Sequence, residues 1–514
     1  TLSKLMMKPL TLLLLLLVLV LVVHLSSSAC SLGIARVGVL INTTASLAEV
    51  PATFLSTTIE ISQLYVPGRL PDTQNPRFVN LARNLAPLRL RVGGTRGDTF
   101  YYDLGPDPVR TPPAPYTIVM NASMVDRFCQ FAQKIDAQVV MGINAGQGPR
   151  SGTADGSWSP ANLEGLLAYV QAHDYPVLGF EFGNEPNLFL YKFGSQATVP
   201  PEQYGRDFLV FQRTLQRYNA SWWAVGADVD YAPVVGEHVI LPDYDQRFLA
   251  VAAPVLDAYT FHFYPLMNKE KLKDAPEFLA ATPQKLLDPL VLNQVGFWGR
   301  RVQERLRNYT ASAELWLGET GSSVGGGAPN ISDRYVDGIE WLDKLGQLSQ
   351  LGLTTVMRQT LSQSDDGDFA YGLMTYDLEP HPSYWMAVLF KQLVGSRALP
   401  VQVLDPLTHK HVRTYAYCGK RRGSVVLTAL NLQQQEAALL DFRDRLGDLQ
   451  YEAYHMTAAL QSDLVQLNNQ TLQANADGTV PPLPPAVTGS FRLRLDPASY
   501  VFVVFTDANA SACR

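Results

Sequence analysis

The sequence predicts an α/β fold, a (β/α)8 TIM barrel with an appended C-terminal β-sandwich domain. Eight short apolar runs recur between residues 54 and 358, and amphipathic stretches of helical period separate several of them. After Gly395 the helical pattern stops and β-rich segments follow. Alternating strand and helix signals are typical of a parallel sheet, and eight such strands over roughly 340 residues fit a closed barrel with insertions.

Two short segments come before the barrel. Lysines precede an apolar run over residues 10–23, and small residues at 26–29 offer a cleavage site, so residues 1–29 are expected to be a secretory signal peptide. An uncleaved membrane anchor is the alternative; otherwise any membrane association is expected to be peripheral. The segment 30–52 contains a strand of small residues at 34–41, which is expected to join the β-sandwich.

The barrel is expected to span residues 53–395, and the β-sandwich domain residues 396–514. Barrel strands are predicted at 54–61, 88–92, 137–143, 177–182, 222–229, 256–263, 314–318 and 353–358. Helices are predicted between several of them, at 162–172, 202–218, 333–351 and 384–394. Sandwich strands are predicted where turn residues separate apolar segments, at 412–417, 424–430, 451–455 and 500–505.

The bulk composition is that of an ordinary folded protein and disfavours one class of partner. Of 514 residues, 47% are hydrophobic and 17% are charged, which describes a folded chain and not a disordered one. The net charge of −6 provides no overall basic field for nucleic acid, which is therefore not expected as a partner. The chain is expected to be a monomer.

The cysteines and glycosylation sequons favour an oxidising, secretory compartment. None of the four cysteines has metal-site spacing, so no cysteine-based zinc site is expected. Cys418 and Cys513 could close the C-terminal region by a disulfide, worth roughly 4–5 kcal/mol in the simple loop model. Seven Asn-x-Ser/Thr sequons offer glycosylation sites, at Asn42, Asn121, Asn219, Asn308, Asn330, Asn469 and Asn509.

Two glutamates are predicted at the carboxyl ends of barrel strands. Glu185 follows the strand at 177–182 and lies within the sequence GNEPN, and Glu319 follows the strand core at 314–318 within WLGET. Taken alone, either glutamate fits a loop-ordering role equally well. In a closed barrel both strand ends face the same mouth, so the two side chains can converge. A pair of carboxylates is what a glycosidase needs, one as acid and one as nucleophile or base.

An ordered series of motifs resembles the heparanase-like endo-β-glucuronidases of glycoside hydrolase family 79. The motifs are GNEPN at 183–187, WLGET at 316–320, GGGAP at 325–329, WLDKLG at 341–346, VMRQ at 356–359 and FKQLVG at 390–395. This resemblance implies a retaining mechanism with Glu185 as acid/base, Glu319 as nucleophile and Asn184 on the sugar 2-hydroxyl. It implies neither a metal nor an organic cofactor.

The same resemblance implies the remaining substrate contacts. Gly325 and Gly326 correspond to the backbone donors for the glucuronate carboxylate, and Tyr371 to a hydroxyl beside them. Further sugar contacts are expected from positions after other strands, at Thr95, His262, Tyr264 and Glu60. The family carries Asp where this chain has Glu60, so that contact gains one methylene.

Two departures from the animal enzymes bear on the substrate. A short Pro-rich stretch, 105–116, stands where those enzymes carry a long excised segment, so no internal cleavage is expected to be needed. The acidic stretch 228–233 stands where they carry basic residues for sulfated heparan, and the nearest cluster, Lys269, Lys271 and Lys273, is expected to be a solvated face. Fewer positive charges should weaken polysulfate binding.

The favoured hypothesis is a secreted retaining β-glucuronidase acting on a glucuronate-containing polysaccharide, proteoglycan or glycoside at a cell wall or matrix. A lysosomal or membrane-associated location is the alternative. Two other functions stay open: an exo-glycosidase of another specificity, such as a β-xylosidase, and a non-catalytic glycan-binding relative. Loss of the contacts at Gly325, Gly326 and Tyr371 would favour the first of these.

Overall fold

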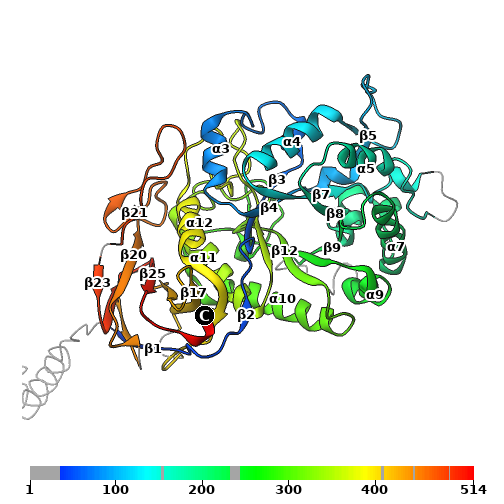
Figure 1. Cartoon of the computed structure of the whole chain (residues 1–514). Helices are drawn as coiled ribbons and strands as arrows, with labels where there is room; N and C mark the ends of the chain where they lie inside the picture. Colours follow the sequence, from blue (N-terminus) through cyan, green and yellow to red (C-terminus); the bar gives the residue numbers. More distant parts are fainter. Residues whose placement is uncertain (1–34, 152–155, 232–242, 407–409, 444–445, 486) are drawn as a thin grey trace, which may run out of the picture.

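Eight parallel strands close into a barrel in a computed structural model that describes residues 35–151, 156–231, 243–406, 410–443, 446–485 and 487–514 (Figure 1). The predicted signal peptide lies outside these residues. Around the barrel the strands are β3 (Leu55–Glu60), β4 (Leu88–Gly93), β7 (Ala137–Ile143), β8 (Val177–Phe182), β9 (Trp223–Asp230), β10 (Ala258–Phe263), β12 (Glu314–Thr320) and β14 (Thr355–Arg358). All eight predicted barrel strands are confirmed, within about two residues at most ends.

A helix follows each barrel strand and covers its outer face, as a (β/α)8 barrel requires. In order they are α3 (Pro76–Arg83), α4 (Ala122–Lys134), α5 (Leu163–Ala172), α7 (Pro201–Tyr218), α9 (Tyr244–Ala252), α10 (Pro289–Arg307), α11 (Tyr335–Leu351) and α12 (Pro382–Leu393), with the short α6 (Phe189–Phe193) before α7. Local sequence fixes several starts: Asn75, Asn121 and Asp288 cap α3, α4 and α10 through their side chains. Proline occupies the first position of α3, α7, α10 and α12, where no N–H is needed.

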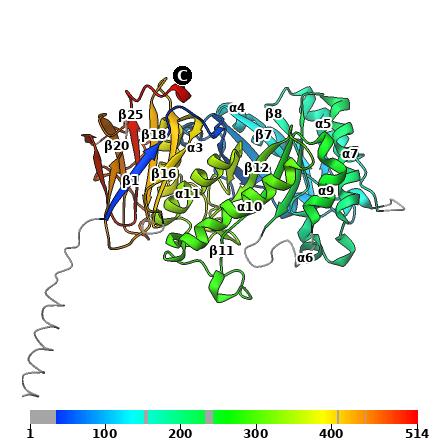
Figure 2. The ribbon, with the colours of Figure 1, turned by 90° about the horizontal axis from the view of Figure 1, so that it is seen from below.

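Two sheets form the β-sandwich beside the barrel (Figure 2). The larger sheet contains β2 (Ala48–Glu49), β15 (Val394–Leu399), β17 (Val412–Gly419), β18 (Val425–Asn431), β25 (Ser499–Phe505), β20 (Tyr451–Thr457), β21 (Gln466–Leu467), β22 (Gln470–Thr471) and β23 (Val487–Gly489). The smaller sheet contains β16 (Val401–Val403), β1 (Ala35–Ile41), β19 (Ala438–Phe442) and β24 (Arg492–Leu495). The strand predicted at 34–41 is therefore β1, and it lies between β16 and β19, two strands that are far from β1 in the sequence.

The larger sheet is buried on both faces. Along β25, Tyr500, Phe502 and Val504 belong to the core that the sheet shares with the barrel helices, whereas Val501 and Val503 face the smaller sheet. This follows from the alternation of side chains along a strand. The barrel and the sandwich therefore share one continuous hydrophobic core.

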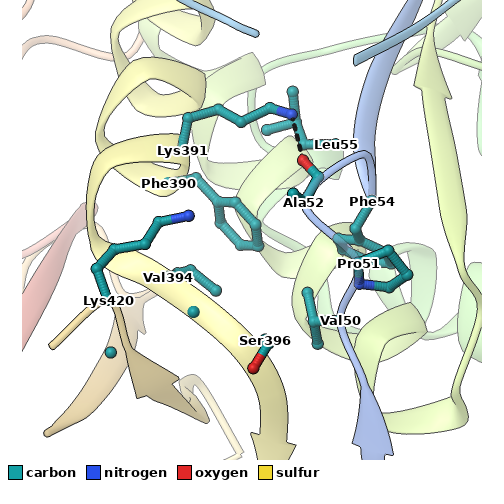
Figure 3. Close-up of a pocket in the computed structure, with 12 residues that line it drawn as sticks. Val50, Pro51, Ala52, Phe54, Leu55, Phe390, Lys391, Val394, Ser396 and Lys420 are labelled. Carbon is teal, nitrogen blue, oxygen red and sulfur yellow. Dashed lines mark hydrogen bonds between the residues drawn. The ribbon is translucent and has the colours of Figure 1, made fainter. Parts of the chain in front are cut away.

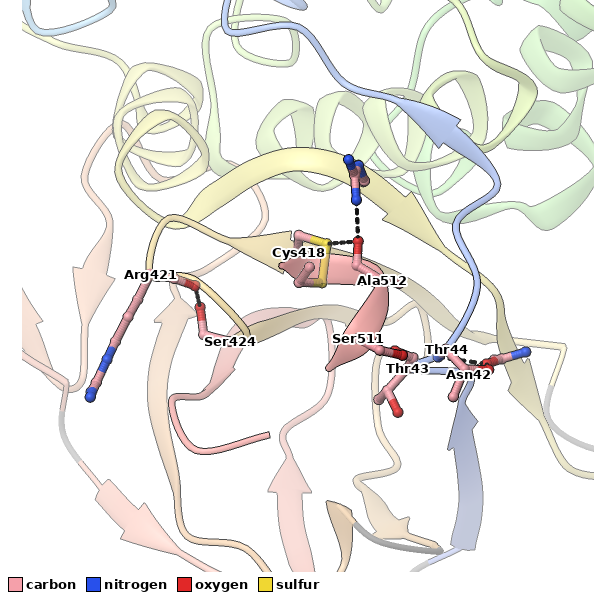
Figure 4. Close-up of a disulfide and its surroundings, with 10 residues drawn as sticks. Asn42, Thr43, Thr44, Cys418, Arg421, Ser424, Ser511 and Ala512 are labelled. Atoms are coloured by element: carbon pink, nitrogen blue, oxygen red, sulfur yellow. Dashed lines mark hydrogen bonds between the residues drawn. A yellow bond between two sulfur atoms is a disulfide. The ribbon is translucent and has the colours of Figure 1, made fainter. Parts of the chain in front are cut away.

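A disulfide ties the end of the chain to the sandwich. Cys418 in β17 and Cys513 are bonded, with their Cα atoms 5.3 Å apart, which confirms the predicted pairing (Figure 4). Beside it, the Ala512 carbonyl accepts a hydrogen bond from Arg397, and the Ala512 N–H donates to Thr43. The last residues therefore bind both the N-terminal segment and strands of the larger sheet.

All seven sequon asparagines lie at exposed or half-buried positions. Asn42, Asn308, Asn330, Asn469 and Asn509 are exposed, and Asn121 and Asn219 are half-buried.

The Pro-rich stretch 105–116 joins β5 (Phe100–Asp103) to β6 (Ile118–Asn121), two short strands that pair with each other. Across the part of the chain that the structure describes, no helix combines the length and apolarity that a membrane span requires.

Candidate active site

Glu185 and Glu319 meet at the carboxyl-terminal mouth of the barrel. One oxygen of each carboxylate and one nitrogen of His262 all lie within 4.8 Å of one another. The two carboxylate side chains keep 12% and 11% of their surface exposed. Other carboxylates nearby, Glu181 and Asp228, are at most 1% exposed. A ligand can therefore reach the carboxylates of Glu185 and Glu319 but not those of Glu181 and Asp228.

Glu319 lies inside β12 and not after it, which corrects the predicted end of that strand. The pairing of β10 with β12 shifts register after Phe261, so that His262 stands directly beside Glu319. The irregularity lets the strand continue to Thr320 while it aims the carboxylate into the mouth, the use that bulges near active sites commonly serve.

The loop that carries Glu185 is held by backbone hydrogen bonds. Glu185 has φ +53°, a left-handed conformation that costs a non-glycine residue about 1–2 kcal/mol. Its N–H donates to the Asp228 carbonyl at 3.0 Å. The N–H of Asn184 donates to Asp98 at 2.9 Å, and Asp98 also accepts from the N–H of Ala145. The Asp98 carboxylate thus joins the loops after β7 and β8.

Arg91, in β4, is the centre of the buried charge network. Its guanidinium is completely buried and donates four hydrogen bonds, to Glu181 at 2.5 Å, Glu319 at 2.8 Å, Asp228 at 2.9 Å and Asn184 at 3.0 Å. One planar cation therefore orients four side chains that come from the strands β8, β9 and β12 or from the loop after β8, as the fork geometry of arginine allows.

Glu185 has two cationic partners. Lys192, on α6, forms an ion pair with Glu185 Oε2, and His262 Nδ1 lies 2.9 Å from Glu185 Oε1. Burial raises the pKa of Glu185, but the charges of Lys192 and His262 outweigh it and hold that pKa well below its usual range. Burial lowers the pKa of His262, but Asp228, 2.7 Å from Nε2, and Glu319 raise it well above the ordinary value. These contacts therefore favour an ionised Glu185 beside a protonated histidine.

Glu319 is held from two sides. The Tyr264 hydroxyl donates to Glu319 Oε1 at 2.7 Å, and Arg91 donates to Oε2. Burial and the nearby Glu319 charge raise the pKa of Tyr264 well above its ordinary value, so the phenol remains a donor. Both contacts hold the carboxylate in a fixed orientation, which suits a nucleophile.

Three consecutive glycines form a loop beside this pair. Gly325, Gly326 and Gly327 all have φ between 76° and 87°, a region that side chains disfavour. Asn268 fixes the loop by donating to the carbonyls of Gly325 and Gly327. A Cβ atom on Gly326 would lie 2.8 Å from Lys271 Nζ, so a cation stands beside the loop.

The other predicted contacts lie around the same mouth. Tyr371 packs beside Tyr264, with ring centroids 6.2 Å apart, and against Gly327. Thr95 is half-buried and begins the 3-10 turn after β4. Glu60, the last residue of β3, accepts from the N–H of Ser62 at 2.7 Å, and burial raises its pKa to about 7.

Three ligand atoms this close could by spacing alone hold a metal ion. Two cations already contact the two carboxylates, however, because Lys192 pairs with Glu185 and Arg91 with Glu319. Adding a divalent ion would place it against both, and like charges repel at this range. The donor set therefore fits an organic substrate better than a metal.

Sequence reasoning missed Arg91, Lys192, Asp98 and Asp228. Arg91 alternates with apolar residues in β4, so a charged residue inside an all-buried strand was the available signal. Asp228 belongs to the acidic stretch 228–233, whose position in the sequence does not reveal its contact with Arg91. Of the predicted solvated lysines, Lys271 is 47% exposed but pairs with Asp368 next to the glycine loop.

Comparisons with known proteins identify the relatives of this chain. The family model "Glycosyl hydrolase family 79, N-terminal domain" matches residues 70–346. Mouse heparanase is 30% identical and covers 91% of this chain and 92% of its own length. Human inactive heparanase-2 is 28% identical and covers 77% of this chain and 66% of its own length. A 4-O-α-L-rhamnosyl-β-D-glucuronidase from Fusarium oxysporum, 17% identical, superposes over 91% of this chain and 99% of that one with a TM-score of 0.66.

Proposed function

The chain belongs to glycosyl hydrolase family 79, and from this we propose that it is a retaining β-glucuronidase of the heparanase-like type. The observation that carries the proposal is the pair Glu185 and Glu319, whose oxygens approach within 4.8 Å while both side chains remain reachable. Carboxyl groups about 5 Å apart suit a double displacement, whereas inversion needs room for a water molecule between them.

In the first step Glu319 attacks the anomeric carbon and the bond to the leaving oxygen breaks. Glu185 gives its proton to that oxygen, and a covalent glycosyl-enzyme forms. In the second step Glu185 takes a proton from water, which attacks the same carbon and releases Glu319. The cations beside Glu185 suit the second step, because a base must be ionised. The first step needs a protonated Glu185, so its contact with Lys192 must weaken when substrate binds.

The glycine loop supports a glucuronate at the site. The N–H groups of Gly325 and Gly326 can approach an anion closely, and Lys271 adds a cation beside them. Tyr371 supplies a hydroxyl, and Asn184, already held by Arg91, is assigned to the sugar 2-hydroxyl. We assign Thr95 and Glu60 to the remaining rim of the sugar site. His262 is fully buried with its two ring nitrogens beside Glu185 and Asp228, so we assign it, contrary to the sequence expectation, to orienting the acid/base, and we assign Tyr264 to orienting the nucleophile.

We place the enzyme outside the cytosol. The disulfide between Cys418 and Cys513 suits an oxidising compartment. The signal-peptide pattern at 1–29 and seven sequons at exposed or half-buried positions support the same location. Glucuronate-containing glycans of a wall or matrix are then within reach.

The test compares hydrolysis of an aryl β-glucuronide with that of the matching β-xyloside and β-glucoside. Glucuronide-selective turnover that Glu319→Gln abolishes would support both the nucleophile and the carboxylate site. Glu185→Gln should slow the first step less for substrates with good leaving groups than for those with poor ones, because only a poor leaving group needs a proton from the acid. If the protein hydrolyses the xyloside faster than the glucuronide, the proposed activity would change from β-glucuronidase to β-xylosidase.

A non-catalytic glycan-binding protein is the second candidate function. The similarity to human inactive heparanase-2 favours it. Saturable binding of glucuronate oligosaccharides without cleavage, by folded wild-type protein, would select this candidate. Cleavage of the same oligosaccharides would exclude it.

A further inference from the structure

A second hollow lies at the opposite end of the barrel from the two glutamates. Its volume is about 220 Å3, and it is lined by the segment 50–55 at the start of β3, the end of α12, and the strands β15 and β17 (Figure 3). Drug-sized ligands occupy pockets of about 300–1,000 Å3, so this hollow suits a smaller molecule. It is built from the barrel and the sandwich together.

Two lysines line the hollow. Lys391 Nζ donates to the carbonyls of Ala52 at 2.8 Å and Pro87 at 2.5 Å. Lys420 follows β17 and is exposed. Figure 3 shows both side chains extending toward the segment that carries Ala52 and Phe54.

No acidic side chain among the described residues forms an ion pair with either lysine. Burial lowers the pKa of Lys391 to about 7, with the charge of Lys420 as the second cause. Burial also lowers the pKa of Lys420. From the elements packed against Lys391, Lys420 is the one charged group found to act on it within the described ranges. The hollow therefore holds positive charge that the protein does not balance, which is costly in a partly desolvated place.

The rest of the lining is largely apolar. Val50, Pro51, Phe54, Phe390 and Val394 form the walls, and Ser396 adds one hydroxyl. An inorganic ion alone would leave these walls in contact with water. A carboxylate on a small apolar body would satisfy both the lysines and the walls.

We propose that this hollow binds a small organic anion, whose oxyanion group contacts Lys391 and Lys420 and whose apolar body packs against Phe54 and Phe390. Because its walls come from both the barrel and the sandwich, the bound molecule stabilises their junction. Binding favours the charged form of Lys391, so it takes up protons near neutral pH and weakens as pH rises above that range. The site does not depend on the glycosidase activity.

The experiment is calorimetric titration with benzoate and with inorganic phosphate, at constant ionic strength in sodium chloride, at about pH 6.5 and about pH 8.5, on either side of the lowered lysine pKa. Wild-type protein should bind benzoate saturably, more tightly than phosphate and more tightly at the lower pH. Lys420→Met should weaken benzoate by about tenfold or more, as expected for one lost charge-assisted hydrogen bond.

Three further outcomes decide the proposal. Lys285 also donates to two backbone carbonyls but lies outside the hollow, so Lys285→Met is the matched control and should bind benzoate like wild type. Lys391→Met should also lose binding; if it fails to fold, Lys420→Met still decides the question. No saturable binding, or equal binding by Lys420→Met, would overturn the site. Phosphate binding as tight as benzoate would overturn the assignment of an organic ligand.

Discussion

Replacing Lys192 with methionine should move the basic limb of the pH profile of kcat/KM to higher pH. Lys192 pairs with Glu185, and the two side chains are only 13% and 12% exposed. Burial raises the pKa of Glu185, but Lys192 and His262 together lower it further than burial raises it. Removing one of the two cations must therefore raise that pKa. Because the first chemical step uses protonated Glu185, the range of pH in which the step proceeds widens upward.

The magnitude follows from the geometry of the pair. Two unit charges about 4 Å apart interact by about 4 kcal/mol at an effective dielectric constant of about 20. The partial exposure of both groups and the flexibility of lysine reduce this to about 2 kcal/mol. Since about 1.4 kcal/mol corresponds to one pH unit, the basic limb should move by about 1.5 pH units.

The assay measures kcat/KM against pH with a glucuronide whose leaving group is poor, so that proton donation limits the rate. Lys192→Arg keeps the charge and serves as the matched control, with a limb that should stay near the wild-type position. His262, Asp230, Asp228, Glu319 and Tyr264 also act on this carboxylate and remain unchanged in both variants. A basic limb that does not move in a folded Lys192→Met protein would refute the reasoning.

Three further changes test other parts of the structure. Tyr264→Phe removes a hydrogen bond to the Glu319 carboxylate, worth about 1.5–3 kcal/mol, so kcat/KM should fall about 10–100-fold in a protein that still folds; a change below threefold would contradict the assigned contact. Arg91→Met leaves several buried carboxylates without their cation and should cost about 3–5 kcal/mol of stability in urea unfolding, whereas a loss below about 1 kcal/mol would show that the network relaxes. Replacing both Cys418 and Cys513 by alanine should lower the free energy of unfolding by roughly 4–5 kcal/mol, since the bridge spans 95 residues, while room-temperature turnover persists.

The fold was predictable because its signals are local. Strands of a parallel barrel are buried on both sides, so each one is a short apolar run, and each is followed by an amphipathic helix. Even the small strand β1 is visible as a run of apolar and small residues. The partners of β1 were less accessible, because pairing with β16 and β19 is fixed by contacts between distant segments.

The site was predictable in part. Glu185 and Glu319 lie in short motifs with glycine or proline neighbours, and a motif can be recognised without knowing the fold. Lys192 and Asp228 act only through partners on other elements, so no spacing in the sequence predicts them. For Arg91, the charge inside a buried strand signals an unusual residue but does not identify its partners. The register shift that aims Glu319 is likewise a property of paired strands and not of one strand.

The place of β1 in the smaller sheet determines when this strand can pair during synthesis of the chain. This strand leaves the ribosome early, yet its parallel neighbour β19 is made about 400 residues later. At about 5–20 residues per second, the wait is about 20–80 s. Until then an apolar strand has no partner, while the barrel behind it can already close. A chaperone that shields residues 35–41 during this interval, or a pause in translation that lengthens it, would change the yield of folded protein without touching any residue of the mature site.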